Sequence, residues 1–187
     1  MLTAEELRDI MPFSGDRADE FEEPLQDAMR EFAVSDNPLR EAAFIAQIAY
    51  ESGELRYMQE IASGEAYNGR ADLGNTRPEA IAAASAAGTT PGPYFKGRGP
   101  LQITGYDNYV ACGAALGLDL VSDPSQLAQP IPACRSAGWF WATHGCNEAA
   151  DKQDFIGITR RINGALTGLA DREKYYRRAL AVLGEQE

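Results

Sequence analysis

Apolar residues recur every three or four positions along most of this chain, which is the spacing of helices that bury one face. Thr3 followed by Glu6 is a capping-box pattern and predicts a helix that begins just after Thr3. Phe21 and Leu25 continue a helical repeat with acidic residues between its members. We therefore expect an amphipathic helix over about 17–34.

The next helix is predicted to be buried on all sides. Asn37 and Pro38 offer an N-cap and a proline at the first helical position. The residues that follow are almost all apolar until the chain reaches Glu51, Ser52 and Gly53. A carboxylate is therefore expected at the end of a core helix.

The middle of the chain loses the helical repeat. Scattered glycines over 54–77 predict one or two short strands and loops, and the glycines and prolines of 88–100 predict an irregular loop. The remaining helices are expected at 78–87, 106–116, after Pro124, before Gly145, at 154–162 and at 170–183. The fold class is mainly α, with a small β or irregular lobe.

Length and charge narrow the class of protein. A chain of 187 residues is the size of one compact domain, and no linker or repeat divides it. The net charge is −11, because residues 1–65 carry 16 acidic and 5 basic residues while 66–187 carry 12 of each. This balance is unlike that of a general nucleic-acid or anionic-membrane binder.

Targeting signals and cysteines indicate where the chain is made. An acidic start and the lack of a long apolar run predict no signal peptide and no transmembrane helix, so we expect synthesis in the cytoplasm. Cys112, Cys134 and Cys146 are odd in number, which favours reduced thiols over a disulfide framework.

Metal and nucleophile chemistry are weakly supported by the sequence. Cys134, His144 and Cys146 offer three metal ligands, but their spacing matches no closed zinc site. Cys112 or Cys146 paired with His144, the single histidine, stays open as a nucleophile pair. We predict neither a metal nor a cofactor.

A pair of carboxylates is the better candidate. Glu51 follows a buried helix, where partial desolvation suits a carboxyl group to donate a proton. Glu60 lies nine residues further on, beyond a glycine turn, and is placed to face it across a cleft. Glu54 and Glu65 compete for this second role, and spacing alone does not choose between them.

Three segments together form a recognisable pattern, and they run from Phe44 to Gly53, from Gly97 to Tyr109, and from Ile158 to Gly164 followed by Asp171-Arg172. They resemble the family 19 glycoside hydrolases, the plant-type chitinases and related bacteriophage endolysins. The resemblance covers about 39–178 and is most specific in the run GRGPLQIT. The opening residues to Pro12 and the short length resemble the phage branch.

The resemblance implies a lysozyme-like, two-lobed helical domain and assigns roles by position. Glu51 corresponds to the general acid, Glu60 to the general base and Thr104 to the hydroxyl that helps hold the attacking water. The residue before the acid is usually His in the family, and here it is Tyr50. The implied sugar-binding positions are Gln102, Asn108, Asn163 and Arg172.

Aromatic residues add further expectations. Tyr67 is predicted to stack on a sugar ring, and Tyr94 with the 88–100 loop is predicted to line the cleft, although ordinary surface packing is the competing interpretation for both. Trp139 and Trp141 are two positions apart on a helix and cannot share one face, so at least one of them is expected in the core.

The expected function is that of a peptidoglycan-degrading endolysin, a muramidase that inverts the anomeric centre. A chitinase is the alternative, and an inactive glycan-binding module is a third. The whole of 1–187 is expected to be one monomeric catalytic domain without a separate wall-binding module. It would leave the cytoplasm through a separate holin, act on the wall in the periplasm, and bind neither nucleic acid nor, stably, the membrane.

One basic segment is expected to face the anionic wall. Residues 160–178 carry six basic side chains against two acidic ones, and the basic ones are Arg160, Arg161, Arg172, Lys174, Arg177 and Arg178. If Arg172 lies in the cleft, this segment points to the end of the molecule that meets the substrate, and salt should weaken binding.

Overall fold

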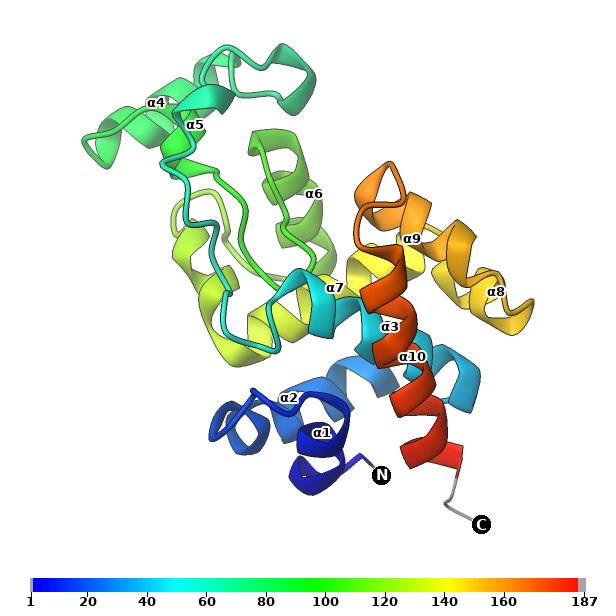
Figure 1. Ribbon diagram of the computed structural model, residues 1–187. Helices are drawn as coiled ribbons and strands as arrows, with labels where there is room; N and C mark the ends of the chain where they lie inside the picture. The colour runs from blue at the N-terminus through cyan, green and yellow to red at the C-terminus, as the bar shows by residue number, and fades with distance from the viewer. Residues whose placement is uncertain (1, 185–187) are drawn as a thin grey trace.

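The chain is described over residues 2–184 by a computed structural model, and those residues form a mainly helical fold (Figure 1). The α-helices are α1 (Ala4–Ile10), α2 (Arg17–Glu31), α3 (Pro38–Glu51), α4 (Pro78–Ala86), α5 (Pro91–Tyr94), α6 (Tyr106–Leu116), α7 (Pro130–Thr143), α8 (Cys146–Asp151), α9 (Phe155–Asn163) and α10 (Leu169–Gly184). Three short 3-10 turns are η1 (Glu65–Tyr67), η2 (Ala71–Leu73) and η3 (Pro124–Ala128).

The predicted helix starts are confirmed. Thr3 and Glu6 form the reciprocal capping box at the start of α1. Asn37 accepts a hydrogen bond of 2.9 Å from the backbone of Leu39, and Pro38 occupies the first turn of α3. Glu51 is the last residue of α3, so a carboxylate does end the core helix.

The predicted strands over 54–77 are wrong. Across residues 2–184 no strand forms, and only two isolated antiparallel bridges join Gln59 to Arg98 and Arg98 to Ile103. Gly64 at the start of η1 and Gly74 at the end of η2 both have left-handed backbone conformations. The segment therefore turns instead of extending as a strand. The small lobe is therefore irregular rather than β.

Two further expectations about local structure are corrected. The 88–100 loop contains the short helix α5, because prolines at both the first and third positions are compatible with helical φ angles. The chain also forms α8 directly after Gly145, where no helix was predicted. Gly145 is left-handed, so it separates α7 from α8 within a sharp turn.

Two hydrophobic cores hold these helices together. The larger one surrounds α3, whose Phe44, Ile45 and Ile48 are fully buried; α3 packs mainly against α10 and also meets α8, and Phe44 contacts α7 through Trp141. The smaller one contains Phe95 and Tyr109 and lies among α6, η3 and the loop before α6. In Figure 1, α4 and α5 lie at one end of the molecule and α1 and α2 at another, with α7 between them. No helix among residues 2–184 is long and apolar enough to cross a membrane.

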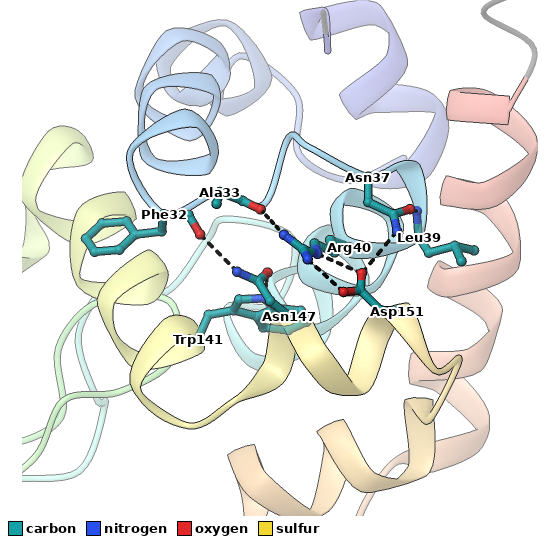
Figure 2. Close-up of polar contacts among 8 residues, drawn as sticks. All are labelled: Phe32, Ala33, Asn37, Leu39, Arg40, Trp141, Asn147 and Asp151. Carbon is teal, nitrogen blue, oxygen red and sulfur yellow. Dashed lines mark hydrogen bonds and ion pairs between the residues drawn. The ribbon is translucent and has the colours of Figure 1, made fainter.

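A polar cluster fixes α8 against the turn between α2 and α3 (Figure 2). Arg40 donates two hydrogen bonds of 2.7 Å to the carboxylate of Asp151 and one of 2.7 Å to the carbonyl of Ala33. Asn147 donates to the carbonyl of Phe32 at 3.0 Å and accepts from the Trp141 indole at 2.8 Å. These bonds hold the start of α3 in place.

The two tryptophans separate as expected. Trp141 is fully buried and packs edge-on against Phe44, with ring centroids 5.2 Å apart. Trp139 points to the other side of α7, where it lines a pocket with residues of the 102–108 segment.

Candidate active site

Glu51 projects from the last turn of α3 and is paired with a cation from α10. Its Oε1 accepts a hydrogen bond of 2.5 Å from Nη2 of Arg172, a residue in the first turn of α10. The Glu51 side chain keeps 20% of its surface exposed, whereas that of Arg172 has none. The Glu51 carboxylate is thus bound by Arg172 through one oxygen and remains partly open to solvent.

Arg172 lies in a closed polar environment. Its Nη1 donates to Oε1 of Gln47 at 2.5 Å and its Nε donates to the carbonyl of Thr167 at 3.1 Å. Gln47 in turn donates to the hydroxyl of Thr159 at 2.9 Å. The expected direct contact of Arg172 with a sugar is therefore corrected: its guanidinium is enclosed, and it orients Glu51 instead.

Tyr50 occupies the position where the resembling family usually has His. The Arg172 guanidinium carbon lies 4.0 Å from the centre of the Tyr50 ring, a close cation–π contact. Gly168, with φ of +70°, leaves room for this ring, because a Cβ there would lie 2.0 Å from the phenol oxygen. Tyr50 thus supports the Arg172–Glu51 pair through its aromatic face.

Glu60 is held by Tyr67 and by the backbone of Gly97. Its Oε1 accepts a hydrogen bond of 3.0 Å from the Tyr67 hydroxyl, and its Oε2 accepts one of 3.2 Å from the backbone of Gly97. Burial, followed by the bond to Glu60, raises the pKa of Tyr67, so this hydroxyl stays protonated as a donor. Tyr67 is thereby shown to hold Glu60, while its stacking on a sugar stays a prediction.

The 97–104 segment forms a tight turn built around buried Arg98. Arg98 donates to the carbonyl of Tyr94 at 2.8 Å, to the hydroxyl of Tyr109 at 2.9 Å and to Oε1 of Gln59 at 2.9 Å. A Cβ on Gly97 would lie 2.3 Å from the amide oxygen of Gln102 and 3.2 Å from the Thr104 hydroxyl, so glycine lets both side chains lie close to the backbone here. The turn therefore joins Glu60 to the residues that follow Arg98.

Three of the predicted site residues line one pocket of about 190 Å³ at the end of this turn. Gln102 donates to the carbonyl of Gly99 at 2.9 Å, and Asn108 donates to the carbonyl of Thr104 at 2.7 Å. The Thr104 hydroxyl donates to the carbonyl of Gln102 at 3.1 Å. These bonds fix Gln102, Thr104 and Asn108 around the pocket.

The opposite wall of this pocket was missed by sequence reasoning. It consists of Trp139, Phe140 and His144, and the imidazole of His144 stacks on Phe140 with ring centres 3.8 Å apart. The order of residues along α7 gives no signal that this helix faces Thr104. Only the position of a lone histidine at a helix end could have drawn attention to it.

Other predicted residues lie elsewhere. Tyr94 donates to the carbonyl of Ser122 at 2.9 Å and lines a separate hollow beside Ala83, so the expectation that it lines the cleft is corrected. Asn163 is exposed at the end of α9, away from the pocket that Gln102 lines. The sequence assigned both positions without knowing which way their elements face.

The competing carboxylates are distinguished by their surroundings. Glu54 is 4% exposed, and its oxygens accept hydrogen bonds from the backbone of Phe13 and from the Tyr175 hydroxyl. Glu65 is exposed at the start of η1. Glu60 alone of these three is hydrogen-bonded to the 97–104 turn, and this favours it as the partner of Glu51.

The cysteine alternatives are disfavoured by burial. Cys112, Cys134 and Cys146 are all buried, and none of them lies in a disulfide. Burial raises the pKa of Cys112 and of Cys146 to about 12, so neither is a ready thiolate nucleophile. Among residues 2–184, no three side chains of metal-ligating type gather as ligands of one ion would.

Three of the basic side chains in residues 160–178 are buried or paired with carboxylates. Arg172 is buried, Lys174 pairs with Asp171 at 2.8 Å, and Arg177 lies 3.9 Å from Glu173. The surface of α10 is therefore mixed in charge rather than uniformly basic.

Comparison with known proteins decides the family. Residues 34–160 match the family model described as chitinase class I, glycoside hydrolase family 19. The chain belongs to glycoside hydrolase family 19. This family 19 chain is 39% identical to an endochitinase of Arabidopsis thaliana over 124 residues, a match that covers 66% of this chain and 38% of that protein.

Two further proteins to which this family 19 member is similar are bacterial. A glycosyl hydrolase family 19 domain-containing protein of Haemophilus influenzae is 40% identical over 84 residues, which cover 44% of this chain and 40% of that one. Chitinase C from Streptomyces griseus shares the fold, with a TM-score of 0.74 and 23% identity over 98% of this chain and 76% of that chain. The mainly α-helical, lysozyme-like fold of family 19 is thus confirmed.

Proposed function

We propose that this family 19 glycoside hydrolase cleaves the β-1,4 glycan of peptidoglycan by a single, inverting displacement. The proposed catalytic mechanism is supported by one observation, which is that two carboxylates are anchored in different cores. Glu51 ends α3 in the larger core, whereas Glu60 is bonded to the turn that leads into the smaller core. A substrate held between these two parts would meet one carboxylate from each side.

The chemistry follows from the two environments. Glu51 protonates the glycosidic oxygen as the bond to the anomeric carbon breaks. Glu60 removes a proton from a water that attacks this carbon from the opposite face, with Thr104 helping to hold the water. Inversion requires carboxyl groups roughly 6.5–9.5 Å apart, so that the water fits between the base and the sugar.

Peptidoglycan as the substrate is supported by the resemblance to phage endolysins, in which the second carboxylate follows the acid by nine residues, as Glu60 follows Glu51. Chitin is the second candidate, because the Arabidopsis and Streptomyces relatives are chitinases by name. Mass spectrometry of digested peptidoglycan tests the choice. We expect products with muramic acid at the new reducing end; glucosamine there refutes the muramidase assignment, and cleavage of chitin oligomers alone favours the chitinase.

The acid is tested by Glu51→Gln, which keeps an oxygen for Arg172 but removes the proton. We expect the rate of glycan cleavage to fall about 10²–10⁴-fold, the usual worth of general acid catalysis. Glu65→Gln, a change at an exposed glutamate, is the matched control and should retain activity. Full activity of the Glu51 variant would contradict the assignment.

The base is tested in the same way by Glu60→Gln. We expect a similar loss of rate, measured for both variants at a temperature well below the unfolding transition of each. If Glu60→Gln keeps near-full activity while Glu54→Gln or Glu65→Gln loses it, the second carboxylate is reassigned. NMR of the first product formed shows whether the anomeric configuration is inverted, and retention would refute the single-displacement mechanism.

A role in host lysis is part of the proposal. The chain would be made in the bacterial cytoplasm as a monomer and reach the wall with the help of a separate holin. Expression with and without a holin tests this route. We expect rapid lysis only with the holin, and lysis at the same time without it would contradict dependence on such a protein.

A further inference from the structure

A second hollow has a volume of about 360 Å³ and lies between α3 and α10. Tyr50 lines it on the α3 side and Asp171 on the α10 side. Neither Glu51 nor Arg172 lines the hollow, but the Tyr50 ring packs on the Arg172 guanidinium, which binds Glu51. The hollow shares no lining residue with the pocket at Thr104.

The walls of this hollow are tied together by one buried carboxylate. Glu54, which is 4% exposed, accepts hydrogen bonds from the backbone of Phe13 and, at 2.6 Å, from the hydroxyl of Tyr175. Glu54 also has a φ of +60°, an uncommon conformation for a residue with a side chain. Three separate segments are thus joined around the hollow.

The lining combines aromatic and charged side chains. Phe13 leaves 75% of its surface in solvent although its backbone is fixed by Glu54. Lys174 pairs with Asp171 at 2.8 Å. The guanidinium of Arg178 lies 5.9 Å from the centre of the Tyr175 ring and, within residues 2–184, has no carboxylate within ion-pair distance. The hollow thus presents an apolar platform with an available cation at its edge.

We propose that this hollow binds the short peptide that peptidoglycan carries on its glycan strand. The inference rests on the proposed function, since it names the part of that substrate which lies outside the scissile bond. A polymer of N-acetylglucosamine is neutral and would gain little from Arg178. A peptide with ionised carboxylates and apolar alanine groups matches both Arg178 and Phe13.

The place of the hollow supports this assignment. The peptide is attached to a sugar of the strand itself, so it must leave the strand within a short distance of the bond that is cut. Two side-chain contacts connect the hollow to the proposed acid, because Tyr50 lines the hollow and packs on Arg172, which binds Glu51. Occupation of the hollow would select strands that carry peptide over bare ones.

Binding is tested with the wild-type chain and a free tetrapeptide of alanine, γ-glutamate, diaminopimelate and alanine, which contains no glycosidic bond. We expect NMR shifts at Phe13 and Tyr175 on titration. Loss of about 1.4 kcal/mol makes binding tenfold weaker, and this is the loss we expect for Arg178→Gln combined with Phe13→Ser. Arg177→Gln, the same change one residue away in a different hollow, should bind like the parent.

Hydrolysis separates this inference from the proposed function. The rate on intact peptidoglycan is divided by the rate on strands freed of peptide by an amidase. We expect the double variant to lower this ratio about tenfold, and the Arg177→Gln control to leave it unchanged. An unchanged ratio, or no peptide shifts in the wild type, overturns the hollow as a peptide site. If the wild-type chain cleaves neither form of peptidoglycan, the proposed function fails instead, and the titration still decides whether the hollow binds peptide.

Discussion

Replacing Arg172 by Met should damage both stability and activity, because this one side chain joins α10 to the end of α3. The substitution keeps most of the apolar volume over Tyr50 and removes the guanidinium. Glu51 then loses its cation, and the amide oxygen of Gln47 loses a donor that lies 2.5 Å away.

The size of the effect follows from burial. Removing one partner of a buried ion pair typically costs about 3–5 kcal/mol, because the remaining charge is left without compensation. Glu51 keeps 20% of its side chain exposed, so water recovers part of this loss and the lower limit applies. A loss of about 3 kcal/mol corresponds to a melting temperature lower by roughly 6–12 °C in a domain of this size.

Activity should fall further than the loss of stability explains. Misplacement of a catalytic group by about 1 Å costs about 10²-fold, so we expect kcat to fall by about that factor at a temperature well below the transition. Arg172→Lys keeps a charge but not the forked guanidinium that reaches both Gln47 and Glu51. Its kcat should therefore lie between that of the parent and that of the Met variant.

Thermal unfolding and steady-state kinetics on a soluble glycan measure both effects. Arg160→Met, a change at an exposed arginine of α9, is the control and should shift stability by no more than about 0.5 kcal/mol. The Arg172→Met effect on kcat should also be much smaller in a Glu51→Gln background, since Arg172 acts through Glu51. A melting temperature and kcat equal to those of the parent, or full additivity with Glu51→Gln, would refute this role.

Three other predictions concern the surroundings of the site and the fold. Gly168→Ala places a Cβ 2.0 Å from the Tyr50 hydroxyl at a φ of +70°. We expect this substitution to lower the free energy of unfolding by about 1–3 kcal/mol in urea titrations. A smaller loss would mean that Tyr50 moves away freely. Tyr67→Phe removes the donor to Glu60 and should lower kcat about tenfold with little change in KM, whereas a change in KM alone would indicate a sugar contact instead. Burial raises the pKa of Glu41, so its contribution to stability is present at acidic pH and is lost as pH rises through the folded-state pKa. Glu41→Gln should therefore raise the melting temperature near pH 7 but not near pH 3, relative to Glu79→Gln in the first turn of α4; a gain that is the same at both pH values would contradict this.

Local structure was predicted well where it depends on neighbours in the sequence. The capping box at Thr3, the N-cap at Asn37 and the glycine that ends α6 are satisfied within one turn of chain. The strands predicted over 54–77 failed because a strand needs a partner, and the partner segment around Arg98 offers only single bridging positions.

The residue types of the site were also legible in the sequence. Glu51 at the end of an apolar helix, Glu60 beyond it and the GRGPLQIT run specified a glycosidase family, and comparison confirmed that family. The direction in which these side chains point could not be predicted from the sequence. Arg172 was expected to contact a sugar and is instead enclosed behind Glu51, from which it is separated by 121 residues of sequence.

The sequence by itself thus determined most of the helices, the family and the set of polar residues, because each depends on local periodicity or on a contiguous motif. The tertiary structure decided which segments hold each carboxylate, which wall faces Thr104 and which hollow lies beside Tyr50. The physical reason is that these relations are contacts between distant segments: Gln47 meets Arg172 across 125 residues, and Glu54 meets Tyr175 across 121. Such contacts form only once the two cores have packed.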